Sequence, residues 1–494
     1  MCIVFSRPHL LLLAKRSNFG GKNSISVNTP TPSRWQKFAS DVGIYTVGNI
    51  GAKLITFALV PFYTHFIPDT AQFGYFDICL TAAFLLSPLL TLNVYNGIVR
   101  YLLDADLQAR QRVTTAMVQL LLRWMTACLA VLVALSFAFT IAHRWLALAL
   151  VVSVTLSDCY GQLARGLGRN KVFVGMGIAT AFLVAVLSVV LVAWMRMGIA
   201  GVFLANILAR FLPVVAVEWR HRLLARHYTR HTGWHEQARE LLRYSVPLLP
   251  TIVIWWVLAF GDRWFVLWAA GPEANGVYAV AARFTGIIYT FAVILQQAWQ
   301  ETAILQYDSD GRDKFFSQIF SIYVFVLITI IVAYTAALHL AYGWLVDNNY
   351  AASAHYIFPM AIAAGIYSIA NFFEMGYQCS KQTHRAVAPS IVTGIVNVCA
   401  NLVLAPLWGC YGVIAASLLS FTLFALYRAI DTRRYFVVQP DARLIVPVAV
   451  LAVFGAMQYV HLSTWLYALT GAMALAIIAA ALPWSRLWSH VPHH

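Results

Sequence analysis

Long apolar stretches recur along almost the whole of this chain, separated by short polar turns. A hydrocarbon core about 30 Å thick needs about 20 apolar residues for each helical crossing, and the stretches have this length. Hydrophobic residues make up 61% of the 494 positions. A soluble fold of this length could not bury so much apolar surface beneath a polar exterior. The sequence therefore predicts an all-α, polytopic membrane protein.

The apolar stretches predict 14 transmembrane helices. The first six are expected near residues 44–65, 76–98, 115–140, 145–164, 172–195 and 199–217. After a basic loop, eight more are expected near residues 245–269, 277–301, 316–341, 355–377, 389–407, 411–430, 443–460 and 464–483. The connecting loops are short, so we expect no extramembrane domain of useful size.

Basic residues in the loops predict the orientation of the chain. With a cytoplasmic N-terminus, the inside segments hold 27 Lys and Arg residues, and the outside loops hold only Arg144 and Arg196. This alternation satisfies the positive-inside rule. We therefore expect a multi-pass membrane protein with both termini in the cytoplasm. The net charge of +15 then reflects orientation and contact with anionic lipids, and its dispersal over separate loops argues against nucleic acid as a partner.

The two halves of the chain resemble each other in the same order. "GIAGV" at Gly198 and Gly201 recurs as "GCYGV" at Gly409 and Gly412, and "DCYGQ" is echoed by "EMGYQ". The outside turn "FIPDTAQFGYF" likewise has a counterpart in "AAGPEANGVYA". An even number of crossings separates the copies, so they run in the same direction. Parallel repeats imply two lobes related by an axis along the membrane normal, with substrate between them.

The repeat predicts five parts of the chain. Residues 1–42 are expected to form a loose basic cytoplasmic tail, and residues 43–217 an N-terminal lobe of helices 1–6. A basic cytoplasmic linker at 218–243 leads to a C-terminal lobe of helices 7–12 at 244–430. Residues 431–494 add helices 13 and 14, which have no counterpart in the repeat, and a cytoplasmic tail.

Ionisable residues inside the predicted helices carry most of the functional information. Eight of them lie well inside the helices: Lys53, Arg123, Asp158, Arg210, Asp262, Arg263, Arg283 and Glu374. Insertion scales assign about 2.5–3.5 kcal/mol to each such residue at mid-bilayer, so eight facing lipid would cost roughly 20–28 kcal/mol. That exceeds the whole stability of a typical domain, about 5–15 kcal/mol. These side chains must therefore line a watered interior, pair with one another, or reach the membrane surface.

Five of the eight residues are cationic, which favours an anionic substrate. Arg263 lies about two turns below the outer end of helix 7, and Arg283 about as far below the outer end of helix 8, so we expect them and Asp262 to form one cluster. Arginine and lysine are the natural donors to phosphate. We predict that Arg263, Arg283, Lys53 and Arg210 bind the substrate.

Three carboxylates are candidates for binding a coupling ion, which we expect to be a proton or Na⁺. Burial disfavours the charged form of Asp158, Glu374 and Asp262. Asp158 and Glu374 could equally serve to neutralise nearby arginines. Asp262 either pairs with Arg263 or binds a different partner, because adjacent helical residues point about 100° apart. No metal site or other cofactor is predicted, since the seven cysteines show no zinc or redox spacing.

Two segments resemble a known family. "GNIGAKLITFALVPFYTHFIPDTAQFGYFD" resembles the first hairpin of bacterial oligosaccharide flippases in the multidrug/oligosaccharidyl-lipid/polysaccharide exporter superfamily. "GDRWFVLWAAGPEANGVYAVAARF" is similar to the same family's segment from helix 7 to helix 8. The family pattern there is an Asp-Arg pair, a Gly-x-Tyr turn and a later basic residue, which correspond to Asp262, Arg263, Gly276, Tyr278 and Arg283. Near the end of helix 1, His65 stands where the family commonly has arginine, which introduces a titratable group at that position.

The resemblance implies a flippase of the bacterial cytoplasmic (inner) membrane. Such a flippase moves undecaprenyl-pyrophosphate-linked oligosaccharides from the inner to the outer leaflet by alternating access. Such a flippase would serve O-antigen-type lipopolysaccharide or other surface polysaccharide biosynthesis. Its partners would be the anionic lipid-linked oligosaccharide, membrane lipids, and polymerase or chain-length proteins of the same pathway.

Two alternatives keep the fold and change the cargo: a multidrug–cation antiporter and a peptidoglycan lipid-precursor flippase. Drug exporters handle cations, so the excess of bases over acids in the helices argues against the first. An enzyme is not expected. The longest outside loop, "AYGWLVDNNYAASAH", has no arginine, and no nucleophile–base pair or nucleotide-binding motif is present.

Overall fold

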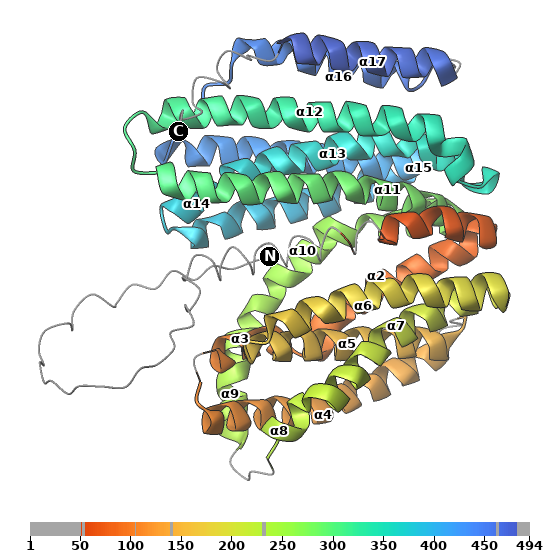
Figure 1. Ribbon diagram of the computed structural model, residues 1–494, viewed down its shortest axis with the longest axis vertical. Coiled ribbons are helices and arrows are strands. Elements are labelled where there is room, and N and C mark those ends of the chain that lie inside the picture. The colour runs from red at the N-terminus through yellow and green to blue at the C-terminus, as the bar shows by residue number, and fades with distance from the viewer. Residues whose placement is uncertain are drawn as a thin grey trace, which may run out of the picture. The chain divides into compact units, whose positions relative to one another are not determined.

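The computed structural model describes residues 51–481 apart from 52–54, 104, 139–141, 230–233 and 461–463. Within these residues the chain forms helices joined by turns and contains no strand (Figure 1). The predicted tail at 1–42, Lys53 and the last residues of the chain lie outside the described residues.

The N-terminal lobe is built from helices at the predicted positions. These are the helix Ile55–Phe66 and α2 (Thr70–Leu90), α3 (Val94–Leu102), α4 (Leu107–Ala138), α5 (Arg144–Gly166), α6 (Asn170–Ser188) with the π-helix η1 (Val189–Trp194), and α7 (Gly198–His221). One predicted helix, 76–98, begins earlier and is split in two. Leu92 and Asn93 adopt left-handed backbone angles, with φ of 49° and 57°, and so end α2 and start α3.

The segment between the lobes, predicted as the linker 218–243, is largely helical. The helices α8 (Leu223–His227) and α9 (Trp234–Ser245) pack against α3 and α4 of the N-terminal lobe. The Thr115 hydroxyl on α4 donates to the carbonyl of Thr229 at 3.0 Å. The Arg123 guanidinium lies 4.7 Å from the ring centre of Trp234, so this cation contacts the linker segment.

The C-terminal lobe and the appended helices follow. They are η2 (Val246–Leu248), α10 (Leu249–Phe260), α11 (Asp262–Gln306), α12 (Arg312–Leu345), η3 (Asn348–Ser353), α13 (Ala354–Phe373), α14 (Met375–Cys379), η4 (Thr383–Ala386), α15 (Val387–Asp431), η5 (Thr432–Arg434), η6 (Ala442–Leu444), α16 (Ile445–Met457) and α17 (Thr464–Ala481). The pair α16 and α17 packs against α12 (Figure 1).

Two glycines divide the longest helices into separate crossings. Gly271 interrupts α11 with φ 88° and ψ 176°, and Gly409 interrupts α15 with φ 55° and ψ −128°. Both angles are accessible to glycine at little cost. Ten described stretches are long and apolar enough to span a membrane, and three shorter apolar helices accompany them. The residues of α11 before Gly271 continue the crossing that α10 begins, whereas Gly409 divides α15 into two crossings. Counted in this way, the described helices match the fourteen that the sequence predicts, and the predicted fold class is confirmed.

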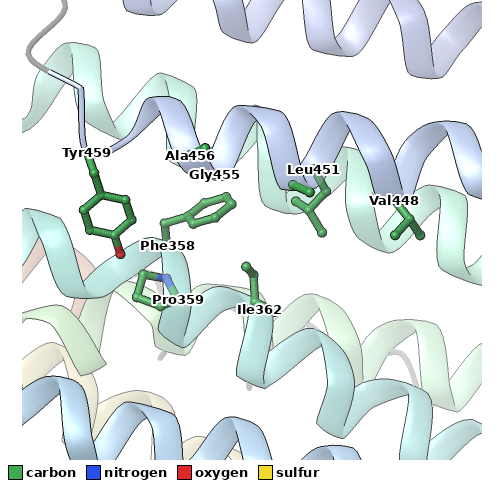
Figure 2. A pocket seen from close by; sticks show the side chains of 9 residues that line it. Phe358, Pro359, Ile362, Val448, Leu451, Gly455, Ala456 and Tyr459 are labelled. Atoms are coloured by element: carbon green, nitrogen blue, oxygen red, sulfur yellow. The ribbon is translucent and has the colours of Figure 1, made fainter.

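A groove on the C-terminal side separates α13 from the appended helix α16. Figure 2 shows Phe358 and Ile362 of α13 facing Val448 and Leu451 of α16 across it. Its volume is about 380 Å³ and its lining is almost wholly apolar. A second cavity, of about 520 Å³, lies between the first turns of α2 and α7 and includes Arg196. None of the predicted substrate-binding residues lines either one.

Candidate functional site

Two of the predicted substrate-binding arginines meet at one carboxylate between the lobes. The Arg263 Nε donates to Asp77 Oδ2 at 2.6 Å, and the Arg283 Nη2 donates to Asp77 Oδ1 at 3.2 Å. Asp77 belongs to α2 of the N-terminal lobe, and both arginines belong to α11 of the C-terminal lobe. The three side chains are 5%, 11% and 12% exposed, in that order. We call Asp77, Arg263 and Arg283 the ion cluster.

The interruption of α11 at Gly271 makes this convergence possible. Arg263 precedes Gly271 and Arg283 follows it, and both still reach the same carboxylate. The predicted cluster of these two arginines is therefore present. Asp262 does not join it, and lies instead among partners of its own lobe, as the angle of about 100° between adjacent helical residues allows.

Aromatic rings lie against both arginines of the ion cluster. The Arg283 guanidinium lies 4.5 Å from the ring centre of Phe73 and 5.8 Å from that of Tyr63. The Arg263 guanidinium lies 5.5 Å from the ring centre of Phe260. Cation–π attraction is strongest where water is excluded. With two guanidinium groups and one carboxylate, the ion cluster keeps one net positive charge that a further anion can neutralise.

The lobes touch at the predicted outer end, next to the ion cluster. A Cβ on Gly74 of α2 would lie 2.5 Å from the Pro272 carbonyl oxygen, and one on Gly276 of α11 would lie 1.9 Å from the Thr70 carbonyl oxygen. The Asn275 side chain donates to the Gly74 carbonyl at 3.0 Å. The two turns that echo each other in sequence thus contact each other directly, backbone against backbone.

A tyrosine from a further predicted outside turn, between α12 and α13, adds to this contact. Tyr350 of η3 is fully buried, and its hydroxyl donates to the Ile67 carbonyl at 2.7 Å. Its ring packs edge-on against Phe73. We call the contact formed by Gly74, Gly276, Asn275 and Tyr350 the hairpin seal. It holds the lobes together at the end that the loop charges place outside.

Asp262 lies in a buried polar network inside the C-terminal lobe. Its Oδ2 accepts from the Tyr278 hydroxyl at 3.0 Å and from the Ser417 hydroxyl at 2.9 Å. Asn401 lies near the same carboxylate and donates to Asn397 Oδ1 at 3.1 Å. Two oxygens in this network, Asp262 Oδ1 and Asn401 Oδ1, are buried without a hydrogen-bond partner.

Arg210 and Asp158 lie together in the N-terminal lobe. Asp158 accepts from the Ser87 hydroxyl at 2.6 Å, and the Arg210 Nη1 donates to the Asn206 carbonyl at 3.0 Å and to its Oδ1 at 2.9 Å. Arg210 is within electrostatic range of Asp158. Tyr63, which lies beside Arg283, is also within range of Arg210. The arginine therefore neighbours the ion cluster without bonding to it.

Glu374 is paired with an arginine, as its alternative role of neutralising a nearby arginine requires. Its carboxylate accepts from the Arg428 Nη1 at 3.1 Å, and the same nitrogen donates to Asn371 Oδ1 at 3.0 Å. Arg428 is 3% exposed, so the pair lies within the C-terminal lobe near its predicted inner end. This arrangement fits the neutralisation of a buried arginine.

The sequence reasoning missed Asp77 and Arg428. The helix predicted at 76–98 placed Asp77 at its very start, whereas α2 begins at Thr70 and carries Asp77 two turns inside. Arg428 lies near the end of the predicted helix 411–430 and counts there among the basic residues of the inside segments, whereas the structure buries its side chain within the lobe, with 3% exposed. A signal for Asp77 existed, since it directly follows the repeated outside turn "FIPDTAQFGYF".

Comparisons with known proteins agree with this fold. A model of the family described as polysaccharide biosynthesis protein matches residues 38–300, more than half of the chain. The structure of a lipid II flippase, MurJ, in an inward closed conformation aligns with a TM-score of 0.67 and 12% identity, covering 90% of this chain and 99% of that one. An inward-facing multidrug resistance MATE family transporter of the MOP superfamily aligns with a TM-score of 0.58 and 13% identity, covering 82% and 96%. A sequence comparison with curated proteins gives no match.

Proposed function

The chain belongs to the polysaccharide biosynthesis protein family, and from this premise we propose that it is a flippase for oligosaccharides linked to undecaprenyl pyrophosphate. It moves them across the cytoplasmic membrane by alternating access for surface polysaccharide or lipopolysaccharide assembly. The observation that carries the proposal is the ion cluster. Two buried arginines of one lobe share a single carboxylate of the other, which leaves one positive charge where the lobes meet.

The chemistry of the ion cluster suits a phosphorylated lipid head. A guanidinium offers phosphate a planar fork of donors, and such charge-assisted bonds are about twice as strong as neutral ones. The neighbouring aromatic rings make the surroundings less polar, and electrostatic attraction is stronger in less polar surroundings. The polyprenyl tail would stay in the bilayer while the head enters between the lobes. Because the hairpin seal closes the predicted outer end, the head would enter from the cytoplasmic side.

Proteoliposomes test this proposal. We expect the purified protein to expose a labelled undecaprenyl-pyrophosphate-linked oligosaccharide on the opposite leaflet at a rate well above that of protein-free liposomes. Unchanged leaflet exposure would overturn the proposed substrate. The same vesicles loaded with lipid II or with cationic drugs measure the two alternatives, and transport of a cationic drug but not of the oligosaccharide would favour an antiporter.

The buried network around Asp262 is our candidate for the coupling-ion site. Its two unpartnered oxygens, Asp262 Oδ1 and Asn401 Oδ1, are the kind of ligand that hard cations take, and a proton on Asp262 would satisfy the same carboxylate. Glu374 is paired with Arg428 and Asp158 lies within range of Arg210. A coupling role for these two carboxylates stays a prediction.

We expect Asp262→Asn to remove the dependence of transport on the coupling ion and to slow transport by about tenfold, the effect of losing roughly 1.4 kcal/mol of ion binding. Thermal unfolding of the detergent-solubilised protein checks binding without transport. Na⁺ should raise the melting temperature of the wild-type protein but not that of the variant. Asp313→Asn, at the exposed end of α12, is the control. If a proton is the ion, a shift in pH replaces Na⁺ in both experiments. Equal ion responses in the wild-type protein and the variant would exclude Asp262.

A further inference from the structure

We propose that Asp77 is a positioning residue that stands in for the phosphate of the substrate. We call the state in which the hairpin seal is closed the sealed state. In it the Asp77 carboxylate accepts hydrogen bonds from both arginines of the ion cluster. An arriving phosphate takes them over and thereby frees α2 to move away from α11. The proposal deepens the proposed function and rests on it. It makes substrate binding the event that opens the hairpin seal.

The positions of the residues along two helices carry the first step. Asp77 and Gly74 are three residues apart on α2, and so lie on one face of that helix. Arg263, Arg283 and Gly276 all belong to α11. The ion cluster and the closest backbone contact of the hairpin seal therefore join the same pair of helices. When α2 moves away from α11 at Gly276, it also withdraws Asp77 from the arginines. Another anion must take the place of Asp77 if the arginines are to stay paired.

The balance of charge carries the second step. If the lobes parted without a substitute anion, both guanidinium groups would lose the carboxylate that they share in a setting lined by Phe73, Tyr63 and Phe260. Loss of the partner of a largely buried charge is strongly unfavourable. A phosphate supplies at least one negative charge and more acceptor oxygens than a carboxylate. Exchange of Asp77 for phosphate keeps both arginines paired. The exchange also leaves the Asp77 carboxylate without a cationic partner. This favours a state in which α2 has moved away from α11 and water solvates Asp77.

Spin labels across the hairpin seal test the proposal. Gln72 of α2 and Glu273 of α11 are both exposed and lie on opposite sides of it. They are replaced by labelled cysteines in a chain without its seven native cysteines. Pulsed distance measurements then report the ratio of separated to sealed molecules. We expect Asp77→Asn without ligand to raise this ratio by about tenfold or more. Undecaprenyl pyrophosphate should produce the same shift in the wild-type chain and little further shift in the variant.

A matched control and a rescue separate this role from a general loss of stability. Glu374→Gln breaks an ion pair confined to the C-terminal lobe and should leave the distances unchanged. Asp77→Glu keeps the charge and should restore a mostly sealed population that still responds to the lipid. If Asp77→Asn does not fold, the response of the wild-type chain to undecaprenyl pyrophosphate decides alone.

The outcomes distinguish this proposal from the proposed function. Wild-type distances that do not change although native mass spectrometry shows bound undecaprenyl pyrophosphate would overturn the role of Asp77 and leave the flippase proposal standing. An Asp77→Asn chain as sealed as the wild type would do the same. Failure of the lipid to bind at all would overturn both proposals.

Discussion

Transport should be almost abolished when either arginine of the ion cluster is replaced by alanine. Each guanidinium is expected to give the phosphate at least one charge-assisted hydrogen bond, worth about 1.5–3 kcal/mol. Because each 1.4 kcal/mol is a factor of ten, Arg263→Ala and Arg283→Ala should each slow leaflet exposure of the lipid-linked oligosaccharide by about 10- to 100-fold. The measurement is the initial rate in proteoliposomes that contain equal amounts of inserted protein.

The chain offers a matched control for this loss. Arg312 on α12 also pairs with an aspartate, Asp313, but at the predicted cytoplasmic surface, and Arg312→Ala should transport at close to the wild-type rate. Lysine at positions 263 and 283 keeps the charge and loses the planar fork, so it should fall between wild type and alanine. Wild-type rates in both alanine variants would remove the phosphate-binding role from these residues.

A single methyl group at the hairpin seal should be as damaging as the loss of an arginine. In Gly276→Ala the new Cβ would lie 1.9 Å from the Thr70 carbonyl oxygen and 2.7 Å from its carbon, with backbone on both sides of the contact. Neither backbone can turn aside as a long side chain could. Overpacking of this kind costs about 1–3 kcal/mol or more, and here the cost falls on the sealed state alone. We expect molecules whose predicted outer end stays open and whose transport falls to near background.

The same helix supplies the control for this substitution. Gly286 lies ten residues further along α11, and a Cβ there would meet nothing within 4 Å. Gly286→Ala should therefore keep both the sealed population and wild-type transport. The spin-label pair across the hairpin seal measures the first quantity, and the proteoliposome assay measures the second. A Gly276→Ala chain that seals and transports like Gly286→Ala would show that the close backbone contact has no role in the transport cycle.

The fold could be predicted from the sequence because the membrane imposes a length on every crossing. Apolar stretches of the right length and the alternation of loop charges together predict fourteen helices, and the described helices follow them closely. The same reasoning places Arg263 and Arg283 at similar depths on neighbouring helices, where the structure brings them together. The packing of α9 against α4 could not be predicted as readily, because the mean composition of α9 is polar.

The site was less predictable, since its partners carry weak sequence signals. Asp77 lies at the start of the helix predicted at 76–98, so a small error in that start hides the position of Asp77 well inside a crossing. Asn401 and Ser417 are uncharged, and such side chains often satisfy their hydrogen bonds within their own helix, so nothing in the sequence pattern marks them as neighbours of Asp262. The direction in which adjacent Asp262 and Arg263 diverge depends on the packing of α11 between α2 and α15, which only the tertiary structure shows.

Recognition of a phosphorylated lipid head by Arg263 and Arg283 is the central claim, and one comparison tests it most directly. Proteoliposomes with wild-type protein, or with the double variant Arg263→Ala/Arg283→Ala, are given either the undecaprenyl-pyrophosphate-linked oligosaccharide or an uncharged analogue with the same sugar and tail. We predict that the wild-type protein moves the charged lipid far faster than the neutral one and that the double variant loses this preference. Equal transport of both lipids by the wild-type protein, or an unchanged preference in the double variant, would contradict the claim.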